Sequence, residues 1–155
     1  PDVRAEVAGN PASAGPALAR LSADPNFRVR IMAAAYPSTP PTVLAAMAAS
    51  GTTDEVRTVA QNLSTPPETL AELAASASAI TRQLVAEHPA TSPETLAELA
   101  ATPIGRVRSA VAKHPAAAPE TLTVLAVDRD PEVRRSALEN PRCPPAGRSA
   151  AGLLN

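Results

Sequence analysis

The sequence contains the same nine residues twice, PETLAELAA at 67–75 and again at 93–101, with an offset of 26 residues. A match of this length indicates an internal repeat, and repeat periods of about 20 to 50 residues are typical of solenoids and similar arrays. The 26-residue frame gives five full copies, at 11–36, 37–62, 63–88, 89–114 and 115–140. A half copy at 1–10 and a degenerate C-terminal cap at 141–155 complete a predicted single repeat domain over 1–155.

The first half of each copy predicts a short helix with one buried face. Its apolar positions are Leu18, Leu44, Leu70, Leu96 and Leu122, followed three residues later by Leu21, Met47, Leu73, Leu99 and Leu125. A small residue comes next in every copy, so the pattern is the i, i+3, i+4 stripe of an amphipathic helix. At the start of this helix Thr65, Pro66 and Glu68 predict a capping box, with Thr65 as the N-cap and Pro66 at the first helical position.

The second half of each copy predicts another helix after a short polar break. Asp130 and Pro131 mark the clearest start, as N-cap and first helical residue. The helix ends at Asn10, Tyr36, Asn62, His88, His114 or Asn140, and a proline follows every one of these except Asn62. One extra residue in the second copy predicts a bulged loop at 50–54 and a shortened helix after it.

Composition supports a thin, closely packed core. Hydrophobic residues make up 45% of the chain, much of it Ala, and Phe27 and Tyr36 are the only aromatic residues. The 18 prolines recur with the repeat and therefore separate the helices. Because helices of two to three turns are unstable alone, the copies must stack. The predicted fold class is an all-α solenoid of short paired helices without a β-sheet.

The pattern Thr-Pro-Pro-Glu-x-Leu-x-x-Leu-Ala, followed by Val-Arg-x-Ala-Val-Ala-x-His-Pro, resembles the leucine-rich repeat variant family. Residues 89–115 carry the nearest match. The resemblance implies alternating α- and 3₁₀-helices wound into a right-handed superhelix. Some members of the family hold an iron–sulfur centre in a cysteine cluster ahead of the repeats, but nothing in this sequence matches that cluster. Residues 128–138 also resemble HEAT repeats of the phycobilisome-lyase type.

An arginine recurs in every second half. The six members of this arginine ladder are Arg4, Arg30, Arg57, Arg82, Arg108 and Arg134. In a structural interpretation, the donors of each guanidinium bind loop carbonyls or a carboxylate such as Asp24, Asp54 or Asp128. In a functional interpretation, the ladder forms a basic stripe for an acidic partner or a phosphate backbone. The stripe would be widened by Arg28, Arg106, Arg129 and Arg135.

Two other recurring sets carry polar chemistry. Asn10, Asn62, His88, His114 and Asn140 occupy one position of the repeat, and the exchange of Asn with His predicts side chains that cap the turn backbone. Metal ligation by His88 and His114 is disfavoured, since residues one repeat apart are too distant for a single ion. Glu68, Glu72, Glu94, Glu98 and Glu120 make the first helices acidic, which predicts a solvated face or a docking face for a basic partner.

The sequence offers no catalytic motif, so we expect no enzyme activity, no cofactor and no metal site. Cys143 is the only cysteine, and we expect it to be exposed and unreactive. Net charge of −1 disfavours binding driven by bulk charge, and no apolar run is long enough for a membrane span. We expect a cytoplasmic scaffold that binds a protein partner, with nucleic-acid binding along the arginine ladder as the alternative and self-association possible in principle. The chain begins at Pro1 within a repeat, which predicts a piece of a longer protein.

Overall fold

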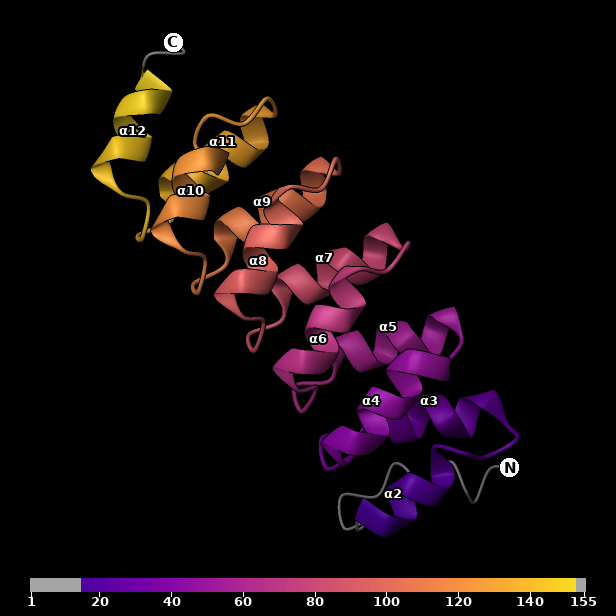
Figure 1. Cartoon of the computed structure of the whole chain (residues 1–155). Helices are drawn as coiled ribbons and strands as arrows, with labels where there is room; N and C mark the ends of the chain where they lie inside the picture. The colour runs from indigo at the N-terminus through magenta and orange to yellow at the C-terminus, as the bar shows by residue number, and fades with distance from the viewer. Residues whose placement is uncertain (1–14, 153–155) are drawn as a thin grey trace. The chain divides into compact units, whose positions relative to one another are not determined.

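The computed structural model describes residues 15–152, and every regular element in this part of the chain is an α-helix (Figure 1). The helices that form the first halves of the copies are α2 (Gly15–Leu21), α4 (Pro41–Ser50), α6 (Pro67–Ala74), α8 (Pro93–Ala100), α10 (Pro119–Leu125) and α12 (Pro145–Gly152). Those of the second halves are α3 (Phe27–Ala35), α5 (Thr53–Gln61), α7 (Ala79–Glu87), α9 (Gly105–Lys113) and α11 (Pro131–Glu139). The predicted all-α helical repeat is confirmed. None of the described helices has the length and apolar character needed to cross a lipid bilayer.

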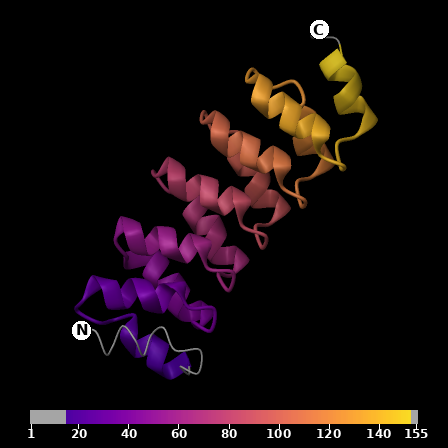
Figure 2. The ribbon, with the colours of Figure 1, turned by 180° about the vertical axis from the view of Figure 1, so that it is seen from behind.

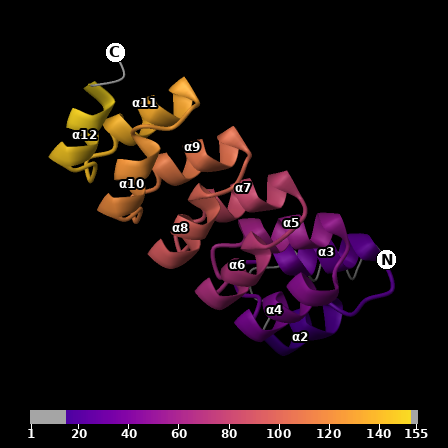
Figure 3. The same cartoon turned by 45° about the horizontal axis from the view of Figure 1, so that its top comes forward.

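The chain divides into two compact units, and the division falls between Leu73 and Ala74, near the end of α6. In the first unit α3 packs on α2 and α5, and α5 packs on α4. In the second unit α7, α9 and α11 pack in succession, with α8 on α9 and α10 on α11 (Figures 2 and 3). The single repeat domain over 1–155 stays a prediction.

The predicted apolar stripe forms the core of both units. Leu18, Leu44, Leu70, Leu96 and Leu122 are completely buried, and Leu21, Met47, Leu73, Leu99 and Leu125 are nearly so. The second helices contribute fully buried valines, at Val29, Val59, Val85, Val107, Val111 and Val133. Burying one such side chain contributes about 1.5–3 kcal/mol relative to leaving it in water. Short helices are therefore held by stacking rather than by their own propensity.

Both halves of each copy are α-helical, whereas the family resemblance implied an alternation of α- and 3₁₀-helices. The described helices run from 7 residues in α2 to 10 residues in α4. Runs of 3₁₀-helix longer than about 3–4 residues are uncommon because their hydrogen-bond geometry is poorer. Helices of this length therefore satisfy their backbone better in the α form.

The threonine ahead of the first helix does not act as the predicted cap. The Thr65 hydroxyl donates to the carbonyl oxygen of Val59 at 2.6 Å, and Thr91 donates to Val85 at 2.5 Å. Both side chains are buried, and each satisfies a carbonyl at the end of the preceding helix. In α8 the N-cap is Ser92, whose hydroxyl accepts from Thr95 N–H, and Pro93 is the first helical residue. Asp130 caps α11 as predicted.

The bulged loop predicted at 50–54 does not form, because α4 is longer and the connection after it is shorter than in the other copies. The helix α4 continues through Ser50, and only Gly51 and Thr52 separate it from α5, which keeps the full nine residues. A Cβ on Gly51 would lie 2.4 Å from the Met47 carbonyl oxygen, so this tight connection requires glycine. The helix α5 occupies the same repeat positions as α3, so the second copy holds no additional residue. Glu55 takes the buried place of Val29, and the Val56-Arg57 pair lies one position later in its helix.

The C-terminal cap forms a helix, in which Gly147 is buried, and Cys143 just before the helix is buried too. The helix α12 packs on α10 and α11. A Cβ on Gly147 would lie 3.2 Å from both Thr123 Cα and Cys143 Sγ, so this glycine permits the close approach of α12 to α10. Cys143 is buried, at 4% exposure, and the prediction of an exposed thiol is wrong. Cys143 takes the repeat position of Thr65 and Thr91, where side chains face inward.

Candidate binding surface

Four arginines of the ladder bind a backbone carbonyl six residues earlier in the chain. The guanidinium Nη1 donates from Arg30 to Asp24 at 2.7 Å, from Arg82 to Ser76 at 2.9 Å, from Arg108 to Thr102 at 3.0 Å and from Arg134 to Asp128 at 2.7 Å. Each acceptor lies in the loop between the two helices of the same copy. The arginine therefore ties the start of the second helix to the loop that precedes it. Arg4 and Asn10 lie outside the described residues.

Two ladder arginines also bind a carboxylate supplied by the following copy. Arg108 holds Asp128 with two hydrogen bonds, from Nε at 2.7 Å and from Nη2 at 2.8 Å. Only 6% and 10% of the two side chains are exposed, so water screens this pair weakly. The hydrogen bonds from Arg108 hold the pKa of the Asp128 carboxyl below its usual value, and Asp128 raises the pKa of Arg108.

Arg30 makes the corresponding pair with a different residue. Its Nε donates to Glu55 Oε1 at 2.5 Å, and the other Glu55 oxygen accepts from Thr52 N–H. Burial raises the pKa of the Glu55 carboxyl, but the hydrogen bonds from Thr52 and Arg30 outweigh burial and hold the pKa below its usual value. Glu55 thus completes a capping box and neutralises Arg30 at the same time.

Arg57 is the exception among the described members of the ladder. Its side chain is 47% exposed and pairs with the exposed Asp54 at 3.0 Å on the same helix. Arg57 lies one position later in its copy than the other arginines, so the residue six positions earlier is Gly51. An exposed pair of this kind contributes little to stability.

The further arginines that could widen a basic stripe are exposed but mostly engaged. Arg129 donates to the Pro103 carbonyl oxygen at 3.0 Å, and Arg135 pairs with Glu132. Arg28 lies over the Phe27 ring, 6.0 Å from its centroid. The arginines of the described residues therefore serve largely internal contacts instead of forming a continuous basic stripe.

The Asn/His positions form a second ladder of hydrogen bonds along the turns. Asn140 Nδ2 donates to the carbonyl oxygens of Ala112 and His114, and its Oδ1 accepts from Arg142 N–H. Asn62 makes the same contacts with Ala34, Tyr36 and Ser64. Each side chain caps its own turn and also binds the end of the preceding copy, which explains why both an acceptor and a donor are needed.

His114 performs both tasks with its two ring nitrogens. Nδ1 accepts from Ala116 N–H at 3.0 Å, so the ring proton is on Nε2, which contacts the His88 carbonyl oxygen at 3.1 Å. Protonating Nδ1 would place two donors against each other. Burial lowers the pKa of His114, the neighbouring His88 lowers it further, and the hydrogen bond to the His88 carbonyl opposes them. His114 is therefore neutral at pH 7.

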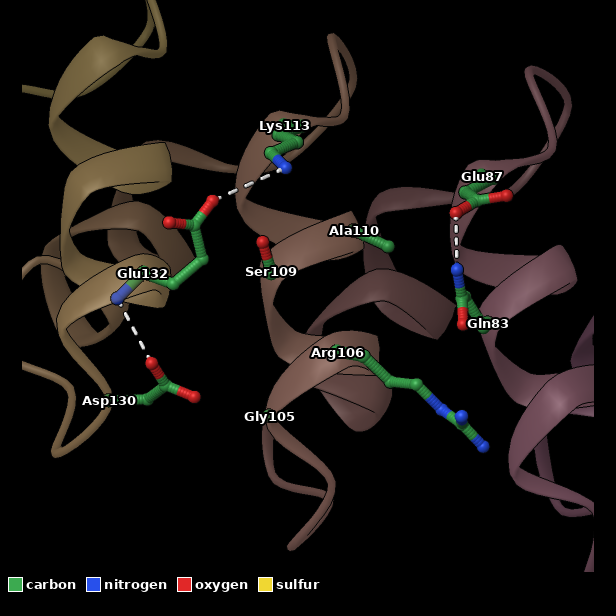
Figure 4. A pocket seen from close by; sticks show the side chains of 9 residues that line it. All are labelled: Gln83, Glu87, Gly105, Arg106, Ser109, Ala110, Lys113, Asp130 and Glu132. Carbon is green, nitrogen blue, oxygen red and sulfur yellow. Dashed lines mark hydrogen bonds and ion pairs between the residues drawn. The ribbon is translucent and has the colours of Figure 1, made fainter.

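The exposed surface of the second helices contains a groove, which we name the α7–α9–α11 groove (Figure 4). Its volume is about 350 Å³, and it is lined by Gln83, Glu87, Gly105, Arg106, Ser109, Ala110, Lys113, Asp130 and Glu132. Gln83 donates to Glu87 at 2.8 Å, and Lys113 lies 3.7 Å from Glu132. Arg106 extends along the groove toward α7 (Figure 4). The groove thus presents both signs of charge to solvent.

Sequence reasoning did not single out this groove, although it named Arg106. The lining residues Arg106 and Glu132 are equivalent positions on α9 and α11, and the equivalent residue of α7 is Ile80, which lies outside the lining. All three are exposed. An apolar, a basic and an acidic residue at one position is the signal that could have identified a variable surface. The glutamates of the first helices, by contrast, are uniformly exposed and acidic.

Comparison with solved structures places the chain among helical-repeat proteins. A structure described as a leucine-rich repeat variant with a novel repetitive protein structural motif matches with a TM-score of 0.69 and 27% sequence identity. The match covers 97% of this chain and 64% of the other, so the chain spans just under two thirds of that protein. An engineered protein matches over 95% of this chain at 19% identity, but its TM-score of 0.46 is too low to support a conclusion about the fold. No protein-family model and no curated protein matches the sequence.

The chain is therefore an all-α helical-repeat protein of the solenoid class. Its structure is similar to that of a leucine-rich repeat variant, as the repeat pattern predicted. Among residues 15–152 no group of three or more His, Cys, Asp or Glu side chains is arranged to hold a metal ion.

Proposed function

We propose that the protein is a non-catalytic scaffold that binds a protein partner through the α7–α9–α11 groove. The observation that carries this proposal is the variation at exposed positions of the groove within an otherwise repetitive unit. Arg106 and Glu132 share one repeat position, and Glu87 and Lys113 share another. The buried positions of the same helices carry no such exchange of charge, since Thr81, Val107 and Val133 share one of them and Val85, Val111 and Ala137 share another. Stacked repeats commonly vary in this way on the surface that contacts a partner.

The mixed charge of the groove supports a polar protein surface as the ligand. Arg106 and Lys113 lie between the acidic residues Glu87 and Glu132, on the three neighbouring helices that line the groove (Figure 4). Complementary charges of this kind select a partner and its orientation more than they add affinity. A uniformly anionic ligand would meet repulsion on both flanks of the groove.

The alternative, nucleic-acid binding along the arginine ladder, receives less support. Arg30 and Arg108 pair with carboxylates of the following copy, and Arg82 and Arg134 bind loop carbonyls. A guanidinium engaged in this way has fewer donors for phosphate oxygens. Arg57 is more exposed than these arginines, but a single exposed arginine does not form a continuous basic stripe.

Site-specific photo-crosslinking in extract from the source cells tests the proposal. A photoreactive phenylalanine analogue at Arg106 should capture a discrete partner, whereas the same analogue at Glu94, on the exposed face of α8, should not. Capture at both sites alike, or at Glu94 alone, would contradict the proposed surface. Titration of duplex DNA at low salt tests the alternative, because phosphate binding should weaken steeply as salt is raised.

A further inference from the structure

Arg82, in the copy at 63–88, has no carboxylate partner of the kind that Asp128 provides for Arg108 in the next copy. In four of the five copies position 14 lies in the loop before the second helix and is Asp24, Ser76, Thr102 or Asp128, whereas Ser50 of the second copy lies in α4. In all four the side-chain oxygen accepts a hydrogen bond from the N–H two residues later. An aspartate has a second oxygen left for the arginine of the preceding copy, whereas the hydroxyl of Ser76 or Thr102 has no second oxygen to offer.

Arg82 and Thr102 line one hollow and occupy the repeat positions of Arg108 and Asp128. Both guanidinium groups are anchored in the same way, with Nη1 on the carbonyl six residues earlier. In Arg108 the edge formed by Nε and Nη2 is then filled by the two oxygens of Asp128. In Arg82 the Nε atom is buried and has no hydrogen-bond partner among the described residues.

A hollow lies beside this incomplete edge. Its volume is about 330 Å³, and Ala75, Arg82, Leu99, Thr102 and Pro103 are among the residues that line it. Glu98 also lines the hollow and is exposed. A buried donor without an acceptor is unfavourable, so an acceptor that enters the hollow is favoured.

We propose that Arg82 and Thr102 form a binding site for a carboxylate group that takes the place of the Asp128 side chain one copy earlier. A carboxylate fits because its two oxygens match the Nε and Nη2 donors, as they do in the Arg108–Asp128 pair. The negative charge of Glu98 disfavours a doubly charged phosphate more than a singly charged carboxylate. The inference goes beyond the proposed function because it assigns a second site and the chemical group that this site binds. The carboxylate belongs either to a free monocarboxylate or to an acidic side chain of a partner.

Nuclear magnetic resonance of the arginine Nε–Hε groups tests the site. The Arg82 signal is identified by its loss in Arg82→Lys. Titration with sodium acetate should move the Arg82 Hε signal downfield in a saturable manner, while the exposed Arg106 serves as the internal control and should shift little. A blocked peptide with one central Glu, compared with its Gln counterpart, distinguishes a partner side chain from a free carboxylate. Inorganic phosphate is expected to produce a smaller shift than acetate.

Thr102→Asp gives the matched variant. Asp24 and Asp128 occupy the equivalent position of their own copies and accept the same hydrogen bond from the N–H two residues later, so the variant should fold. Its Arg82 Hε signal should be shifted downfield without any ligand and should no longer respond to acetate. The proposal is overturned if acetate and both peptides leave the Arg82 signal unmoved, if phosphate is preferred, or if Thr102→Asp does not change the signal. A response to the Glu peptide alone assigns the site to a partner, and a response to acetate assigns it to the free anion.

Discussion

The copies that contain Arg108 and Arg82 share one backbone arrangement but differ in what surrounds the arginine. Both side chains bind a loop carbonyl through Nη1. Arg108 also pairs with Asp128, whereas Thr102 stands at the equivalent position for Arg82, whose buried Nε has no hydrogen-bond partner among the described residues. The recurring arginine is thus a constant anchor, and the residue supplied by the next copy decides whether it closes an ion pair or leaves an open donor.

The largest expected effect is the loss of the carboxylate from the closed pair. Asp128→Ala should lower the free energy of unfolding by about 3–5 kcal/mol, because it leaves the Arg108 charge buried and unpaired. Thr102→Ala is the matched control, since it also removes a side chain that caps its own loop. We expect the control to cost about 0.5–1.5 kcal/mol in urea unfolding. Equal losses would mean that the ion pair contributes nothing beyond the cap.

Truncation of the leucine stripe should affect the two copies alike. Leu96 and Leu122 are completely buried at the same repeat position. Each change to Ala should cost about 2–5 kcal/mol through lost burial and the cavity left behind. Thermal and urea unfolding of both variants would measure this. A loss confined to one copy would show that the copies differ in packing and not only at the arginine.

The turn ladder offers a smaller, pH-dependent comparison between His114 and Asn140. The pKa of His114 is lowered in the folded protein, so the unfolded chain binds more protons as the pH falls. The stability that neutral His114 provides is therefore lost as the pH falls below about 6.5, the pKa of an unperturbed histidine. His114→Asn introduces the residue found at 140 and should flatten this part of the dependence.

Melting temperatures of the wild type and His114→Asn between about pH 7.5 and about pH 5.5 check this expectation. The wild type should lose more on acidification than the variant. A parallel fall of the two curves would contradict the assignment of the proton to Nε2 and the lowered pKa.

The smallest effect is expected at Arg57. Its exposed pair with Asp54 is open to solvent and salt. Arg57→Ala should change the free energy of unfolding by less than about 1 kcal/mol, in contrast to the buried arginine of the fourth copy. A loss as large as that of Arg108→Ala would show that Arg57 makes the buried contacts of the other arginines although it lies one position later in its copy.

Periodicity made the helices and their buried face predictable, because stacked copies must bury the same positions. The buried Leu96 and the capping residue Asp130 follow directly from spacing and local chemistry. The role of Thr65 does not follow from spacing. A threonine before Pro-Pro can cap the next helix or bind the end of the previous one, and the packing of the two helices determines which contact forms. The same holds for Cys143, whose burial depends on how closely Gly147 allows α12 to approach.

The arginine ladder was visible in the sequence, but its two states were not. Distinguishing Arg108 from Arg82 requires knowing that position 14 of the following copy lies opposite the guanidinium. That information is in the stacking of copies and not in any one copy. The groove on α7, α9 and α11 was missed for the same reason, since its residues come from three helices.

Double-mutant cycles on the two arginines test the central claim most directly. One cycle combines Arg108→Ala with Asp128→Ala, and the other combines Arg82→Ala with Thr102→Ala, each measured by urea unfolding. We predict a coupling free energy of about 1.5–3 kcal/mol for Arg108 and Asp128, and less than about 0.5 kcal/mol for Arg82 and Thr102. Couplings that agree within about 0.5 kcal/mol would contradict the conclusion that the following copy determines the state of each arginine.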